Sequence, residues 1–231
     1  MTLLSSAVGI FCGFMWVIGF YYQLKVFSKV GASVAVPLTN GLQLLFASIL
    51  SLTIFSEIVG LKNIAFLFVY MIILVIGIIF VSKKENNIES KSMDKTLYID
   101  AVISSIAFIV FMSTNKIFSL SSYSLFFPQT IGMSLGALYI NKENIKSLVN
   151  KKAIMATITG FIWFLANFSM LLSIENFGLG ITIAMVQFNI VVSAILSILI
   201  LKEKKTKKEL IYLVLGILCI VYAGVSIALI K

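Results

Sequence analysis

The feature that most constrains this chain is a series of apolar runs, each long enough to cross a lipid bilayer as a helix. A helix needs about 20 mostly apolar residues to span the hydrocarbon core. The eight runs cover residues 3–24, 33–56, 63–82, 97–118, 122–140, 153–174, 178–201 and 210–230. With 60% hydrophobic and 12% charged residues over 231 positions, the chain is too apolar for a soluble domain. Because the runs are continuous rather than alternating, they predict an all-α polytopic membrane protein and not a barrel.

Basic residues are gathered in alternate loops between these runs. All eighteen are lysine, and the chain has no histidine. If the runs cross the membrane in turn, fifteen lysines fall on one side and three on the other. The richer side holds the loops at residues 25–29, 83–95, 142–152 and 202–208. The positive-inside rule therefore predicts that these loops are cytoplasmic and that both termini lie outside the cell membrane. We read the lysines as anchors at the lipid bilayer and not as a nucleic-acid surface.

Two parts of the chain share one pattern. Three residues recur at a constant offset of 147 positions, with Gly13, Trp16 and Gly31 matching Gly160, Trp163 and Gly178. A second apolar run with amides then follows, carrying Asn40 and Gln43 in one copy and Gln187 and Asn189 in the other. The copies lie five runs apart and so have opposite orientation. This is an inverted-topology repeat, an architecture common among transporters.

The repeat predicts how the chain is divided. Residues 1–82 form a first repeat of three helices, residues 83–96 a polar cytoplasmic linker, and residues 97–231 a second repeat of five helices. Shifting the second repeat back by the same offset places two further helices before Met1. The alternatives are a late start, a truncated gene, or an eight-helix protein that works alone, as a homodimer or with partner helices.

Polar and aromatic side chains occur in the middle of several runs. An amide that faces lipid without a partner costs on the order of 1–3 kcal/mol, so such groups are expected to face the interior of a helix bundle. We take the following as candidate substrate-binding residues: Trp16, Asn40, Gln43, Gln129, Trp163, Asn167 and Gln187. The alternatives are a helix–helix hydrogen bond for each amide and interfacial anchoring for each tryptophan.

These residue types favour a neutral, polyhydroxylated ligand. Amides both donate and accept hydrogen bonds, and an indole ring can cover the C–H face of a sugar. The absence of arginine weighs against a phosphorylated substrate. The carboxylates near run ends, Glu57, Asp100 and Glu175, are candidates for proton coupling, with surface anchoring as the alternative.

Enzyme chemistry is not expected. The chain lacks histidine, and its two cysteines, Cys12 and Cys219, lie inside apolar runs, where they are read as small buried hydrophobic residues. No nucleophile–base pair, metal cluster or cofactor motif can be assembled from what remains. Two motifs, Gly9-x-x-x-Gly13 and Gly132-x-x-x-Gly136, predict close packing of helices instead.

Three segments resemble a known family. They are VPLTNGLQLLFASILSLTIFSE at 36–57, FPQTIGMSLGAL at 127–138, and residues 160–210, which begin GFIWFLAN and end KEKKTKKEL. They resemble the glucose/ribose porter (sugar uptake) family of the drug/metabolite transporter superfamily, and the resemblance extends over essentially the whole chain. It implies a ten-helix 5+5 inverted-repeat fold and proton-coupled secondary uptake of a monosaccharide by alternating access. Two alternatives stay open: an exporter of another neutral small metabolite, or a truncated remnant that does not transport.

Overall fold

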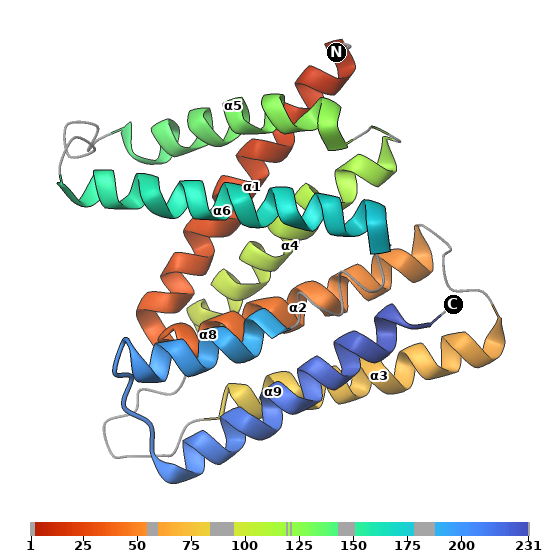
Figure 1. The fold of residues 1–231 in the computed structure, drawn as a ribbon. Coiled ribbons are helices and arrows are strands. Elements are labelled where there is room, and N and C mark those ends of the chain that lie inside the picture. Colours follow the sequence, from red (N-terminus) through yellow and green to blue (C-terminus); the bar gives the residue numbers. More distant parts are fainter. Residues whose placement is uncertain are drawn as a thin grey trace. The chain divides into compact units, whose positions relative to one another are not determined.

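The structure is a computed structural model that describes residues 3–54, 60–83, 95–118, 120, 122–142, 151–177 and 188–230. All regular secondary structure in these residues is helical (Figure 1). The eight helices are α1 (Leu3–Val30), α2 (Ala32–Thr53), α3 (Leu61–Val81), α4 (Lys95–Ile117), α5 (Ser122–Ile140), α6 (Lys151–Phe177), α8 (Phe188–Leu199) and α9 (Lys207–Ala228). Each falls on one predicted run, so the all-helical prediction is confirmed for this part of the chain.

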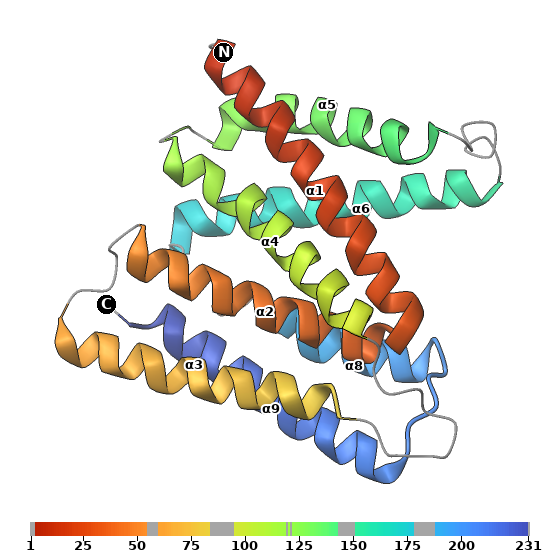
Figure 2. The same ribbon diagram turned by 180° about the vertical axis from the view of Figure 1, so that it is seen from behind.

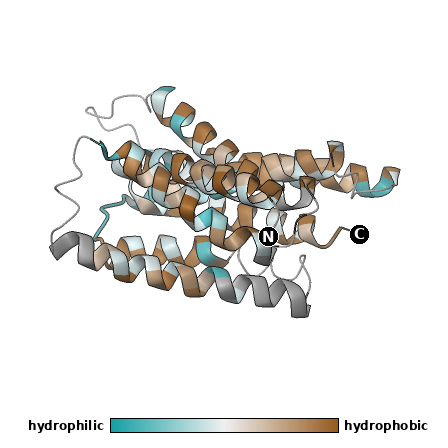
Figure 3. Ribbon diagram, turned by 90° about the horizontal axis from the view of Figure 1, so that it is seen from above, coloured by the Kyte–Doolittle hydropathy of each residue, from teal (hydrophilic) through white to brown (hydrophobic). Residues whose placement is uncertain are grey.

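Five of these helices are long and apolar enough to cross a membrane: α1, α2, α3, α4 and α9. Shorter apolar segments lie at Met155–Asn167 in α6 and at Phe188–Leu199 in α8. Figure 3 shows apolar residues on most sides of the helices, and large side chains such as Ile72 and Leu218 are about 60% exposed. Exposed apolar surface of this kind suits contact with lipid. The chain is therefore a multi-pass membrane protein, while the count of eight spans stays a prediction.

Two helix ends differ from the predicted boundaries for local reasons. Helix α1 continues six residues past position 24, to Val30, where Gly31 takes a positive φ of 77°. In these last turns the Lys25 ammonium lies 4.5 Å from the Tyr21 ring centroid, which keeps the charge at the edge of the apolar region. Helix α9 begins at Lys207 and not at 210, because Thr206 and Glu209 form a capping box.

The chain divides into two compact units. The first consists of Met1–Ile18 and Val110–Thr182, and the second of Gly19–Ile109 and Ile183–Lys231. Each unit therefore contains helices from both predicted repeats. The repeat itself, like the division at residues 83–96, stays a prediction.

In the second unit, helices pack in pairs. Helix α3 runs along α9, and α2 runs along α8, as both ribbon views show (Figures 1 and 2). The α3–α9 contact is close because a Cβ on Gly77 would lie 2.9 Å from the Gly216 carbonyl oxygen, and one on Gly216 would lie 2.7 Å from that of Gly77. Tyr70 meets Tyr222 edge-on at 6.1 Å between ring centroids. Because lipid is as apolar as these side chains, close van der Waals contact is what holds the pair together.

Candidate substrate-binding site

The two predicted glycine motifs meet each other in the first unit, where α1 crosses α5. A Cβ on Gly13 would lie 2.0 Å from the backbone oxygen of Gln129, and a Cβ on Gly132 would lie 2.0 Å from that of Ile10. The other glycines of the motifs lie at the same crossing: Gly9 and Gly136. Since no Cβ fits between these backbones, α1 and α5 touch directly, and the prediction that the motifs pack helices is confirmed.

This crossing holds a buried polar cluster. The Cys12 thiol on α1 lies beside the side chains of Thr114 on α4 and Gln129 on α5. Cys12 is fully buried, Thr114 is 4% exposed and Gln129 is 8% exposed. Thr114 also donates its hydroxyl hydrogen bond to the backbone oxygen of Val110. Cys12 is buried as the sequence predicts, but it takes part in polar contacts that its apolar surroundings in the sequence did not indicate.

The two tryptophans meet one another in the same unit. The rings of Trp16 on α1 and Trp163 on α6 have centroids 4.9 Å apart and are tilted by 58°. Both side chains are partly buried. Trp16 lies one helical turn after Cys12, so the ring pair and the polar cluster occupy adjacent turns of α1. The structure thus brings together the two tryptophans of the chain, which are also partners in the sequence repeat.

Asn167 lies one turn after Trp163 on α6. Its amide nitrogen donates to the Trp163 backbone oxygen at 3.0 Å, a contact within its own helix. Nearby, Phe126 of α5 meets Phe164 of α6 edge-on, with centroids 5.7 Å apart. The amide is partly buried and fixed to the backbone that carries the ring pair. This hydrogen bond lies within α6. It is not the hydrogen bond between two helices that the sequence offered as the alternative for each amide.

The amides of α2 belong to the second unit. Asn40 and Gln43 are both partly buried there. The residue before Asn40, Thr39, is fully buried and is contacted from two helices: Gln23 of α1 donates to its hydroxyl at 3.0 Å, and Ser105 of α4 donates to its backbone oxygen at 3.1 Å. The sequence analysis did not select Thr39 or Ser105. The signal for Ser105 was the pair Ser104-Ser105 in the middle of an apolar run, where a polar side chain is expected to bond a neighbouring helix.

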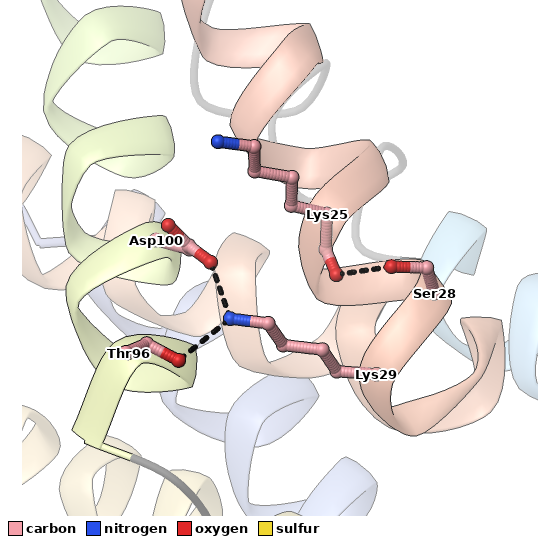
Figure 4. A network of polar contacts seen from close by, with 5 residues as sticks. All are labelled: Lys25, Ser28, Lys29, Thr96 and Asp100. Atoms are coloured by element: carbon pink, nitrogen blue, oxygen red, sulfur yellow. Dashed lines mark hydrogen bonds and ion pairs between the residues drawn. The ribbon is translucent and has the colours of Figure 1, made fainter.

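Asp100 is the one candidate coupling carboxylate whose side chain the structure describes. Its Oδ2 atom lies 2.6 Å from the Lys29 ammonium, which also donates to the Thr96 hydroxyl at 2.8 Å (Figure 4). Asp100 is 9% exposed. Figure 4 also shows Lys25, one turn earlier on α1, whose backbone oxygen accepts from the Ser28 hydroxyl. A carboxylate buried to this degree is satisfied by its charged partner.

Three candidates lie outside the described residues or side chains: Glu57, Gln187 and the side chain of Glu175. Most of the predicted linker at residues 83–96 does so as well. Within the part of the chain that is described, no three His, Cys, Asp or Glu side chains gather as a metal site would require.

Glu203 is a residue that sequence reasoning missed. Its carboxylate, in the segment between α8 and α9, accepts from the backbone nitrogen of Ala32 at 2.6 Å and from that of Ser33 at 3.4 Å. It also accepts from the Ser33 hydroxyl. The first turn of α2 is thereby capped by a side chain 170 residues away in sequence, since Gly31 has no side chain with which to cap it. No local sequence pattern signals so distant a partner.

Comparison with known proteins gives a consistent family. The family model described as sugar transport protein matches residues 1–230. A probable glucose uptake protein of Priestia megaterium is 31% identical over 234 residues, covering 100% of this chain and 81% of the relative. A putative sugar uptake protein of Listeria innocua is 29% identical over 231 residues, with the same coverage. No solved structure matches. Because the family match includes every residue of the ring pair and the polar cluster, the whole site lies within the shared region. The chain belongs to the sugar transport protein family.

Proposed function

We propose that this chain is a secondary transporter that takes up a monosaccharide, such as glucose or ribose, across the cell membrane by alternating access. The observation that carries the proposal is the contact of Trp16 with Trp163, one turn from buried polar groups, in a member of a sugar transport family. The names of the relatives, as glucose and sugar uptake proteins, support the same substrate class.

The chemistry of the site supports a neutral sugar. The pyranose ring has an apolar C–H face, which an indole ring can cover, and a rim of hydroxyls, which amides can bind as donor and acceptor. Trp16 and Trp163 would supply the aromatic surface, while Gln129 and Asn167 would supply amides. All four side chains are uncharged, so a sugar phosphate would lack the cationic partner that its charge needs. From their sequence positions, we keep Asn40, Gln43 and Gln187 as further proposed ligands.

Proton coupling is the finer part of the proposal. Among the three candidate carboxylates, Asp100 is the one whose surroundings are described: it is buried and paired with Lys29. Breaking this ion pair would release a contact between α1 and α4, which links the carboxylate to a movement of these two helices. Glu57 and Glu175 stay candidates on their sequence positions alone.

The proposed orientation places the lysine-rich loops in the cytoplasm and both termini outside. Its support is the lysine distribution; lysines over aromatic rings near helix ends mark the membrane interface on either side, since Lys62 on the predicted outer side also lies over Phe66. Lys83 lies 4.5 Å from the Tyr212 ring centroid, and Lys142 lies 5.5 Å from that of Tyr139. Such pairs suit a membrane interface, where the ring is apolar and the ammonium reaches water.

The proposal is tested by uptake of labelled glucose and ribose in cells that lack their own carriers for these sugars. We expect the chain to accumulate one of them and a protonophore to abolish the accumulation. Replacing Trp163→Ala or Asn167→Ala should weaken uptake at least several-fold, while Trp163→Phe, which keeps a ring, should be the milder change. Membrane level is measured for each variant by immunoblot.

Two results would overturn the proposal. Wild-type uptake in the Trp163→Ala and Asn167→Ala variants would remove the site assignment. No uptake of any neutral sugar by a chain present in the membrane would remove the function. If cells that contain the chain take up no sugar but release a preloaded neutral metabolite, the result would favour the exporter alternative.

A further inference from the structure

We propose that Glu203 is a positioning residue for the transport cycle, whose carboxylate clamps the α1–α2 turn to the α8–α9 segment and holds that end of the second unit closed. The clamp consists of Glu203 with Gly31, Ala32 and Ser33. The inference rests on the proposed function, because a clamp of this kind matters only to a protein that opens and closes.

The shape of the turn is fitted to this carboxylate. Gly31 has φ +77°, and a Cβ at this position would lie 2.6 Å from the carboxyl carbon of Glu203. Any larger residue at Gly31 would therefore be strained and would also push the carboxylate away. Beyond the glycine, the first N–H groups of α2 have no partner within their own helix, and a negatively charged group is favoured at a helix N-terminus. The clamp is charge-assisted as well as geometrically specific.

The clamp joins segments that belong to different predicted repeats. Gly31–Ser33 lies in the first repeat, whereas Glu203 follows α8 of the second. The neighbouring Lys29 binds Asp100 of α4, which is again a contact between the two repeats. The α1–α2 turn is thus held from two sides by charged groups of the second repeat. In an inverted-repeat transporter, helix ends at one membrane face separate when the site opens to that face.

The position of the clamp relates it to the transport site. Helix α2 begins at the clamp and carries Asn40 about two turns and Gln43 about three turns further on. Because the clamp fixes the first turn of α2, its release would let this helix shift as a rigid element. The lysine-rich loops that contain Lys29 and Lys202 lie on the predicted cytoplasmic side. Release of the clamp would therefore open the second unit toward the cytoplasm.

The same segment supplies a matched control. Glu209 lies six residues after Glu203, but it accepts from the backbone nitrogen of Thr206 and so caps its own helix. Glu209→Gln removes one negative charge and weakens the cap of α9, while the Glu203 contacts with Ala32 and Ser33 are kept. Glu203→Gln removes the same charge from the clamp. If the two variants behave differently, the difference is due to loss of the clamp and not to loss of a negative charge from this segment.

The test measures the exposure of a residue just beyond the clamp. Ala35 is fully buried one turn into α2. In an Ala35→Cys reporter, with Cys219→Ser to lower the background, thiol labelling is followed in inside-out vesicles that present the cytoplasmic face. We expect Glu203→Gln to accelerate labelling about ten-fold, since losing charge-assisted hydrogen bonds shifts a two-state equilibrium by this order. Glu209→Gln should label at the wild-type rate.

A second pair of variants separates gating from loss of structure. Ser33→Ala removes the clamp hydroxyl, whereas Ser33→Thr keeps it, so Ser33→Ala should label faster and Ser33→Thr should restore the slow rate. In uptake assays, Glu203→Gln should change the maximal rate at least several-fold while the sugar KM stays within about two-fold, because no ligand is removed.

Equal labelling rates in Glu203→Gln, Glu209→Gln and wild type would overturn the clamp, as would equal rates in Ser33→Ala and Ser33→Thr. Each variant is first shown to melt as a folded protein. Because labelling needs no sugar, the clamp is decided even if the wild-type chain takes up none. Absence of uptake would then count against the proposed function alone.

Discussion

The crossing of α1 and α5 makes a sharp prediction about a single methyl group. At Gly132, the two helices touch backbone to backbone, and an added Cβ would lie 2.0 Å from the Ile10 oxygen and 2.8 Å from the Ile10 carbonyl carbon. We expect Gly132→Ala to force the helices apart. At Gly160 on α6, an added Cβ meets nothing within 4 Å, so Gly160→Ala is the matched control in the same unit.

The magnitude follows from the geometry. Ordinary contact begins at 3.4 Å, so the new Cβ and the Ile10 oxygen must separate by about 1.4 Å. Overpacking in a well-packed interior costs about 1–3 kcal/mol, and a clash with rigid backbone belongs at the upper end of that range. The shift would also disturb the Cys12–Gln129 contact at the same crossing. In contrast, Gly160→Ala should be neutral or stabilising by up to about 1 kcal/mol, because alanine favours a helix.

The assay is thermal unfolding of the purified chain in detergent, with Gly132→Ala, Gly160→Ala and wild type compared in one preparation. We expect Gly132→Ala to melt clearly below the other two and to lose uptake. If Gly132→Ala melted with Gly160→Ala and wild type, the backbone contact of α1 with α5, and with it the site built on this contact, would be refuted.

Two further predictions concern charged and polar contacts. Lys29→Met should lower the free energy of unfolding by about 1–3 kcal/mol, because it leaves Asp100 without its ammonium partner. Exchanging the two residues, as Lys29→Asp with Asp100→Lys, should recover part of this loss. An unchanged melting temperature in Lys29→Met would show that the ion pair contributes nothing to stability. Cys12→Ser keeps a polar group beside Gln129, whereas Cys12→Val does not, so Cys12→Ser should retain more sugar uptake. Equal uptake by the two variants would show that the polar cluster has no part in transport.

Much of the fold could be predicted because membrane helices are encoded locally. Hydrocarbon demands about 20 apolar residues in a row, so the positions of α1 to α4 and of α9 follow from the runs. The glycine motifs predicted close packing, and the offset that relates Trp16 to Trp163 singled out two residues that the structure brings into contact. The motifs did not say which helices they would join, because any two of them could pair.

The contacts that escaped prediction depend on partners far apart in the chain. Glu203 caps α2 across 170 positions, and a carboxylate in a lysine-rich loop looks like a solvated side chain. The Asn167 amide donates to the Trp163 backbone oxygen of its own helix. The spacing of residues in the sequence does not determine which side-chain rotamer makes this contact. Cys12 is small and lies among apolar neighbours in the sequence, so nothing there indicated that Thr114 and Gln129 would lie beside it.

The most direct test of the central claim uses the fact that the chain contains two tryptophans, Trp16 and Trp163, which form the proposed sugar surface. Tryptophan emission of the purified protein therefore reports on this site alone. Titration with glucose or ribose should give a saturable change in emission that glucose 6-phosphate does not produce and that Gln129→Ala weakens. An emission spectrum unchanged by a sugar that the same protein transports would contradict the assignment of the site.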